Sequence, residues 1–355
     1  MMKVLILTPE LRIGGTCRDA VEWANRFVAA GDDVGLIALS AEGEGVGRLR
    51  PEVHRVGLGG GRAIASSLKL LGILRQHPFA VILANAGTLA GLAILFRGLG
   101  LIRNRIVFVD PFNPADTLRH DCKTRLIYRW LLWRADAFVH LSRFAERVHL
   151  AVGLTPTKSH LIPNVSSPRH RRTSPKPLGA PLRLIAVGRL DRIKGFDRLI
   201  RALKSIVVRR PGTTLRIVGE GCDRSRLEAI ICESGMAAYV TLIGHSDNVA
   251  GELRDADLFV LPSLYEGMPN TLVEALDEGL RVVATSCRGT VRSLMYQIGA
   301  SEMLIDEHVF EAGLGRAIDA ALGLDDIAWG EIHARHRAIF DPDLNFNKLR
   351  NLLLA

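Results

Sequence analysis

The chain has 355 residues, of which 48% are hydrophobic and 23% charged, so it can bury the cores of two domains and is not an intrinsically disordered chain. Its five cysteines are odd in number and include no Cys-x-x-Cys pair, which argues against a disulfide framework or a zinc site and for a reducing compartment. The net charge is +9, and residues 1–163 carry nearly all of it, with 21 Lys and Arg against 13 Asp and Glu.

The first half of the chain has the pattern of a Rossmann-like α/β domain. The apolar run Lys3–Thr8 predicts a strand of a parallel sheet that is buried on both faces. Gly14 and Gly15 follow it, and a helix over Asp19–Ala30 then leads to a second strand at Val34–Leu39, which completes a β-α-β unit. Further strands are predicted at Ala80–Ala84, Arg105–Val109 and Ala137–His140.

Two apolar stretches of this half could be mistaken for targeting or membrane segments. Only four apolar residues follow Lys3 before Thr8, which is too short for the core of a signal peptide. The 17-residue stretch Ala86–Ile102 contains Arg97 and several glycines, so we expect a buried helix of an α/β domain rather than a membrane span. The predicted location is therefore cytoplasmic.

The second half repeats the plan. A strand at Arg183–Val187, a loop at Gly188–Gly195 and an amphipathic helix at Phe196–Arg209 are followed by strands at Thr214–Val218, Val240–Ile243, Leu258–Leu261 and Val282–Ala284. The sequence thus predicts two Rossmann-like, doubly wound domains. They would span residues 1–163 and 183–342, with a Pro-, Ser- and Arg-rich linker at 164–182 and a C-terminal helix at 343–355 that returns to the first domain.

Ligands of open α/β sheets bind outside the carboxyl ends of the strands, so we expect a site in a cleft between the two domains. The segment 261–276 has such a position, because a buried strand is followed by a loop with Glu266 and Gly267 and then by a helix with Glu274. The start of that helix suits a phosphate, and two carboxylates suit the hydroxyl groups of a sugar and a ribose. The alternatives are that Glu266 caps the helix and that Glu274 is solvated.

A second loop, Gly188–Gly195, also follows a predicted strand. Arg189 can meet a diphosphate with two N–H groups at once, and Lys194 adds a mobile positive charge. A departing phosphate oxygen gains negative charge, which fixed cations stabilise. A surface loop with a salt bridge is the alternative interpretation of this motif.

The motifs GRL-(x)3-KG, VGEG, LIGHSDN and DLFVLPSLYEGMPNTLVEAL together resemble the retaining glycosyltransferases of family 4, which have the GT-B architecture. The resemblance is strong from residue 182 to 290 and weaker at Gly14 and Gly15. It implies that Arg189 and Lys194 hold the diphosphate of a nucleotide sugar and that Glu266, the third predicted catalytic residue, contacts the donor sugar. The other donor-binding residues that it implies are Gly15, His245, Gly267, Met268, Pro269, Asn270, Thr271, Leu272 and Glu274.

The chain departs from the family pattern at one place. Many relatives have a histidine in the loop after the strand that corresponds to Arg105–Val109, where this chain has Asp110 and Asn113, with His120 further on. No residue is assigned that role. No metal site is predicted either, because the Asp-x-Asp pattern that ends at Asp257 falls between a predicted helix and a buried strand, and no cofactor is expected besides the nucleotide sugar as co-substrate.

The basic first half suits an anionic partner, with an ordinary basic surface as the alternative. Arginines interleave with Trp130 and Trp133 in the segment 123–147, which is typical of an interfacial membrane helix but equally of a domain core with a solvated rim. The resemblance then implies an acceptor saccharide, carried on a polyprenyl diphosphate, at the inner face of a membrane. Nucleic-acid binding is not predicted, because the arginines are dispersed and no reading module is present.

The resemblance therefore implies a metal-independent enzyme that moves a hexose or N-acetylhexosamine from a nucleotide diphosphate sugar, expected to be a UDP sugar, in bacterial surface or exopolysaccharide synthesis. Two alternatives stay open. A sugar-nucleotide epimerase of the same architecture would use a similar cleft without an acceptor. A catalytically silent paralogue would act as a partner subunit.

Overall fold

The computed structural model describes all residues except 12–14, 41, 60–62, 79, 111–131 and 165–180. The chain divides into two compact units, which are residues Met1–Ser167 with Phe340–Ala355 and residues Pro168–Ile339. Most of the segment predicted as a linker, residues 165–180, lies outside the described residues. Among the described helices, none has the length and apolar character needed to cross a bilayer.

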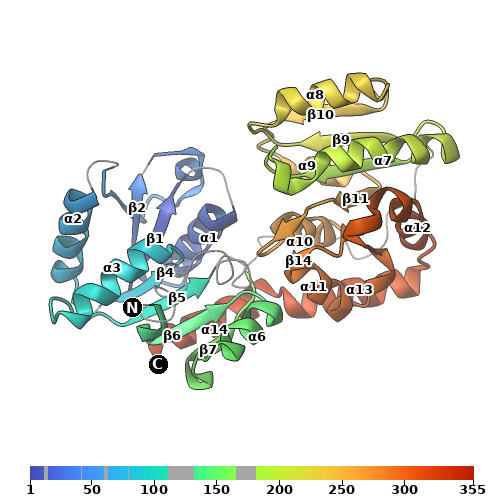
Figure 1. Cartoon of the computed structure of the whole chain (residues 1–355). Coiled ribbons are helices and arrows are strands. Elements are labelled where there is room, and N and C mark those ends of the chain that lie inside the picture. Colours follow the sequence, from blue (N-terminus) through green and yellow to red (C-terminus); the bar gives the residue numbers. More distant parts are fainter. Residues whose placement is uncertain (12–14, 41, 60–62, 79, 111–131, 165–180) are drawn as a thin grey trace. The chain divides into compact units, whose positions relative to one another are not determined.

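The first unit is built on a parallel sheet with the strand order β3-β2-β1-β4-β5-β6-β7 (Figure 1). Its strands are β1 (Lys3–Glu10), β2 (Asp33–Ser40), β3 (His54–Gly57), β4 (Val81–Ala84), β5 (Ile106–Asp110), β6 (Ala137–His140) and β7 (Ser159–Leu161). Its α-helices are α1 (Gly15–Ala29), α2 (Ala63–Gln76), α3 (Gly87–Gly98), α6 (Arg143–Ala151) and α14 (Pro342–Leu354). The buried helix expected within 86–102 is confirmed as α3.

The C-terminal helix α14 packs on the first unit. The rings of Phe346 and Phe27 on α1 meet edge to face at 5.0 Å between centroids. Arg350 forms a salt bridge with the buried Asp32 at 2.8 Å, and Arg105 donates to the carbonyl of Leu352 at the end of the helix at 2.7 Å. Apolar packing and these charge-assisted bonds hold the last helix against a domain that is distant in sequence.

The second unit has a six-stranded parallel sheet with the order β10-β9-β8-β11-β13-β15 and a two-stranded sheet, β12-β14. The strands are β8 (Arg183–Val187), β9 (Thr214–Val218), β10 (Val240–Gly244), β11 (Leu258–Leu261), β12 (Tyr265–Glu266), β13 (Arg281–Thr285), β14 (Arg288–Gly289) and β15 (Leu304–Ile305). The α-helices are α7 (Phe196–Arg209), α8 (Arg224–Glu233), α9 (Val249–Asp255), α10 (Asn270–Asp277), α11 (Thr290–Ile298), α12 (Phe310–Leu322) and α13 (Asp326–Ile339).

Both sheets bury their strands on two faces, as the continuous apolar runs predict. Every residue of β5, β11 and β13 is buried, and helices flank each sheet in Figure 1. In the second unit the strand order reverses between β8 and β11, because the chain proceeds from β8 to β9 and β10 in one direction and from β11 to β13 and β15 in the other. Such a switch point is where open α/β sheets bind ligands.

Candidate active site

The two loops that leave the switch point of the second unit carry the residues predicted as catalytic. The loop after β8 contains Arg189 and a short 3₁₀ turn, Arg192–Lys194, and the loop after β11 leads to Glu266. Because β8 and β11 are parallel neighbours, both loops leave the same edge of the sheet. The strand order therefore brings together two motifs that are more than 60 residues apart in the chain.

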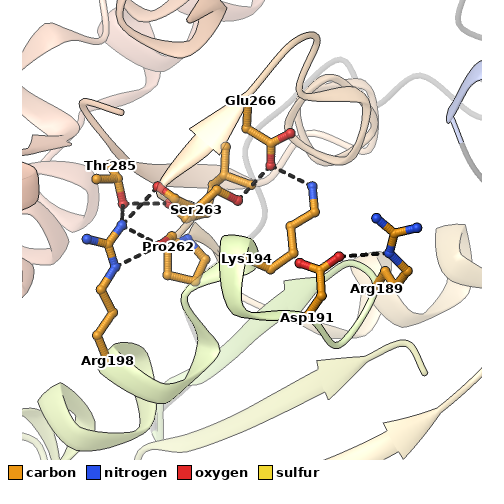
Figure 2. A network of polar contacts seen from close by, with 9 residues as sticks. Arg189, Asp191, Lys194, Arg198, Pro262, Ser263, Glu266 and Thr285 are labelled. Carbon is orange, nitrogen blue, oxygen red and sulfur yellow. Dashed lines mark hydrogen bonds and ion pairs between the residues drawn. The ribbon is translucent and has the colours of Figure 1, made fainter. Parts of the chain in front are cut away.

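Lys194 and Glu266 form an ion pair, with 2.8 Å between Nζ and Oε1 (Figure 2). The Glu266 side chain is only 7% exposed, and that of Lys194 is 25% exposed. The hydroxyl of Ser263 donates to the same carboxylate oxygen at 2.6 Å. The alternative that Glu266 caps the following helix is wrong, because Pro269 is the cap residue of α10 and Glu266 is used by Lys194 and Ser263.

Arg189 is the most accessible of the predicted catalytic residues. Its side chain is 75% exposed, and its Nε lies 2.7 Å from Oδ2 of Asp191 in the same loop. A surface ion pair of this kind is weak. The guanidinium therefore stays near the loop but remains available to bind a ligand that carries more negative charge than Asp191. Figure 2 shows Arg189 on the same loop as Lys194, while Glu266 comes from the loop after β11.

Close backbone packing explains the glycines of these motifs. Gly195 has φ +65°, and a Cβ there would lie 2.2 Å from the Pro262 carbonyl oxygen. Gly219 of the VGEG motif has φ +143°, and a Cβ there would lie 1.9 Å from the carbonyl oxygen of Gly188. Any side chain at these positions would force the loops apart, since backbone atoms cannot yield as a flexible side chain can.

The short strand pair β12–β14 fixes the backbone of Glu266. Glu266 is the register partner of Gly289, and Tyr265 that of Arg288. The Thr290 hydroxyl donates to the Gly267 carbonyl one residue further on. The remaining residues of the predicted donor loop continue into α10, and of these Pro269 and Leu272 are buried while Gly267, Met268, Asn270, Thr271 and Glu274 are half-buried.

Other predicted residues lie at comparable strand and helix ends. His245 directly follows β10, is exposed, and has its Nε2 3.3 Å from Oδ1 of Asp247. Gly15 is the exposed first residue of α1 in the first unit. Glu274 lies in the second turn of α10 and is half-buried.

Asp257 of the Asp-x-Asp pattern has a structural role. Its carboxylate accepts hydrogen bonds from the Arg183 backbone N at 2.9 Å and from the Arg183 guanidinium at 2.8 and 3.1 Å. These bonds join the end of the α9–β11 connection to the first residue of β8. Over the described part of the chain, no three His, Cys, Asp or Glu side chains come together as a metal site would require.

In the first unit, Asp110 at the end of β5 is buried. Asp110 is 1% exposed, and its Oδ2 lies 3.3 Å from Nε2 of His149 on α6. His149 in turn lies 3.3 Å from His140, measured between their Nδ1 atoms. Burial lowers the pKa of His149 to about 4 and that of His140 to about 3, so both rings are neutral at pH 7.

Asp110 therefore faces an interior histidine pair and is not presented to solvent. Asn113, His120 and Trp130 lie outside the described residues. Of the segment 123–147, the described part includes the short 3₁₀ helix Leu132–Arg134 and the strand β6, with Trp133 half-buried.

The sequence interpretation missed three residues of the site: Arg198, Ser263 and Thr285. Ser263 had one available signal, because both halves of the chain repeat a strand that is followed by a serine. In the first half that serine, Ser142, caps α6, whereas Ser263 donates to Glu266. Arg198 had no such signal, because an arginine on an amphipathic helix usually lies in solvent.

Family models and known proteins match large parts of this chain. A family model described as glycosyl transferases group 1 matches residues 181–322, and one described as glycosyl transferase 4-like domain matches residues 14–165. An uncharacterized glycosyltransferase of Methanocaldococcus jannaschii is 32% identical over 52% of this chain and 48% of its own length. The chain thus spans about half of that relative.

Two further matches extend over nearly the whole chain. The amylovoran biosynthesis glycosyltransferase AmsD of Erwinia amylovora is 24% identical over 99% of this chain and 100% of its own length. The crystal structure of Anabaena HepE in complex with UDP has a TM-score of 0.80 at 17% identity and covers 99% of both chains. This structural similarity establishes the two-domain α/β architecture.

Proposed function

This chain belongs to the group 1 glycosyltransferases and has their GT-B architecture, and we propose that it transfers a hexose or N-acetylhexosamine from a nucleotide diphosphate sugar to a saccharide. The observation that carries the proposal is the Lys194–Glu266 pair at the switch point of the second unit, beside the accessible Arg189. This arrangement offers two cations to a diphosphate and a carboxylate to a sugar.

Lys194 and Arg189 would bind the diphosphate of the donor. When the anion arrives, Lys194 would exchange part of its contact with Glu266 for a contact with a phosphate oxygen, since its Nζ has three donors. Arg189 would add its planar fork, which matches two phosphate oxygens. Both charges would stabilise the leaving group as the bond between the anomeric carbon and the phosphate oxygen breaks.

Glu266 would accept a hydrogen bond from a hydroxyl of the donor sugar while it still accepts the hydrogen bond from the Ser263 hydroxyl. Glu274 would accept from the ribose hydroxyls, and His245 would lie near the base. The incoming acceptor oxygen would form its bond to the anomeric carbon on the face from which the phosphate leaves, and its proton would pass to the leaving phosphate oxygen. The anomeric configuration would be retained without a protein nucleophile.

The donor base is proposed to be uracil. The loop Tyr265–Thr271 resembles UDP-sugar users, and the structurally similar HepE was crystallised with UDP. The acceptor is proposed to be a growing surface or exopolysaccharide chain carried on a polyprenyl diphosphate. The excess of positive charge in residues 1–163 supports an anionic acceptor or a membrane surface at the cytoplasmic face.

A ligand panel tests the donor proposal. A ligand that binds only the folded protein raises its melting temperature by mass action, so UDP and UDP sugars should raise the Tm more than GDP, ADP or their sugars. Turnover of the stabilising donor with a saccharide acceptor, followed by NMR of the product's anomeric proton, then tests transfer and retention.

Three results would count against these proposals. Better stabilisation by GDP would overturn the uracil assignment, and an inverted product would overturn retention. Stabilisation by UDP sugars without transfer to any saccharide, but with epimerised donor, would favour the epimerase alternative. Both relatives described above are named as glycosyltransferases, which supports transfer.

A further inference from the structure

Arg198 reaches from the first turn of α7 into the turn that follows β11 (Figure 2). Its Nε donates to the Pro262 carbonyl at 2.8 Å, and its Nη2 donates to the Ser263 carbonyl at 2.9 Å and to the Thr285 hydroxyl at 3.0 Å. The guanidinium carbon also lies 4.4 Å from the centroid of the Phe310 ring. The planar fork of an arginine is thus used to join β11, β13 and α12.

The hydrogen-bond acceptors of Arg198 are neutral oxygens. Burial therefore lowers its pKa, although Cys287 and Glu307 act in the opposite direction. Burial of the charged guanidinium is unfavourable because the group loses hydration, but it provides the carbonyls of Pro262 and Ser263 with a hydrogen-bond donor each. Arg198 consequently bonds both carbonyls of the turn that precedes Glu266.

A continuous chain of contacts leads from Arg198 to the proposed donor site. The backbone of Ser263 accepts from Arg198, and the hydroxyl of the same residue donates to Glu266 at 2.6 Å. The carboxylate oxygen that accepts this bond also contacts Lys194 at 2.8 Å. A shift of the turn would therefore displace the sugar-binding carboxylate and the phosphate-binding cation together.

We propose that Arg198 is a positioning residue of the donor site, which holds Glu266 and Lys194 in the geometry needed for transfer by bonding the 262–263 turn. This inference rests on the proposed function for its kinetic consequences. The contacts of Arg198 predict that removing its side chain disorders the 262–263 turn, and that the loss of transfer activity is a consequence of this disorder.

The test compares Arg198→Met with Arg281→Met. Arg281 is a matched control, because its guanidinium also donates to two backbone carbonyls of the second unit, those of Ala321 and Leu324, at 2.9 and 2.8 Å. It lies at the first residue of β13, whereas Thr285 ends that strand at the site. Both substitutions should lower the Tm, but only Arg198→Met should lower the rate of transfer from the donor.

The expected kinetic result for Arg198→Met is a loss of roughly 30- to 100-fold in kcat/KM for the donor, mostly in kcat, because misplacement of catalytic groups raises the transition-state energy. Arg281→Met should stay within about twofold of wild type at a temperature well below its Tm. Equal losses in the two variants, or wild-type kinetics in Arg198→Met, would overturn the proposal.

A ligand-free readout keeps the test independent of activity. Cys287 is 3% exposed and follows β13 two residues after Thr285, whose hydroxyl accepts a hydrogen bond from Arg198. Alkylation of Cys287, followed by mass spectrometry of its peptide, should be at least about tenfold faster in Arg198→Met than in wild type, because local opening exposes buried groups. An unchanged rate in folded Arg198→Met would contradict a role in ordering the turn.

Two more variants test whether Arg198 acts through Ser263 and provide a measurement if Arg198→Met does not fold. If Arg198 acts through Ser263, the double variant Arg198→Met/Ser263→Ala should be no worse than the more damaged single variant, whereas multiplied losses would refute the pathway. If Arg198→Met does not fold, Arg198→Lys carries the test. Its single ammonium cannot replace the fork, so it should restore the Tm more fully than kcat.

The two proposals fail in different ways. A wild-type protein that transfers no sugar contradicts the proposed function, while the Cys287 alkylation rates still decide whether Arg198 orders the turn. An active wild-type protein with Arg198→Met kinetics equal to its own contradicts only the role of Arg198.

Discussion

Replacing Lys194 with alanine should damage both stability and catalysis, for reasons that can be separated. In the ligand-free protein the substitution leaves Glu266, whose side chain is 7% exposed, without the cation 2.8 Å away. At an effective dielectric constant of about 20, charges at that separation attract by about 6 kcal/mol before desolvation is counted. Desolvation and the partial exposure of Lys194 offset much of this, so we expect a net loss of about 2 kcal/mol.

That loss corresponds to a fall in Tm of roughly 4–8 °C for a unit of this size. Replacing Glu266 with glutamine in the same protein removes the orphaned charge, so Lys194→Ala/Glu266→Gln should be more stable than Lys194→Ala alone. The exposed Lys204 on α7, the helix that follows the Lys194 turn, is the matched control, and Lys204→Ala should leave both Tm and kinetics unchanged.

The catalytic effect appears in donor kinetics measured below the Tm of every variant. Losing one preorganised cation at the leaving group should lower kcat by about 10²- to 10³-fold, as for removal of one donor from an oxyanion hole. A Lys194→Ala protein with wild-type kcat would refute the assignment of this loop to the diphosphate. Normal kcat with a lowered Tm would show that the pair is only structural.

Three further outcomes are expected. Glu274→Ala should mainly raise the donor KM, by about 10- to 100-fold, since a ribose contact of ~1.5–3 kcal/mol acts equally in ground and transition states; a change confined to kcat would contradict this. Treatment with EDTA should leave turnover intact, because two cations neutralise the diphosphate; recovery of lost activity by Mg²⁺ or Mn²⁺ would disprove it. The free energy of unfolding measured in urea should fall by about 2 kcal/mol from pH 7 to pH 5 for each histidine that stays neutral in the native state. In the unfolded chain a histidine takes up a proton near pH 6.5. In the native state the pKa of His140 is lowered to about 3 and that of His149 to about 4, so these two rings stay neutral. His140→Phe should flatten this dependence, and an unchanged slope would contradict the assignment.

Much of the fold follows from local sequence pattern. The strands β6, β8, β9 and β11 and the helix α7 begin and end at the predicted residues, because fully buried strands appear as apolar runs and an amphipathic helix as a 3.6-residue period. The strands that the pattern missed are β3, β7, β12, β14 and β15, which have two to four residues. Runs this short have too few apolar positions to show a period.

The sequence by itself also determined which residue types are available for a sugar diphosphate. Arg189, Lys194, Glu266 and Glu274 were recognised from their motifs and from their positions after predicted strands. The roles of these residues in binding and transfer stay proposals, which the experiments above address.

Only the tertiary structure decided which of these side chains meet. Lys194 and Glu266 are 72 residues apart, and they pair because β8 and β11 are neighbours in the sheet. It also placed Asp110 in the interior against His149 and turned Arg198 from a helix-surface residue into a bond between loops. The physical reason is that periodicity records which positions avoid water, whereas ion pairs and hydrogen bonds depend on the order of strands, which no local pattern contains.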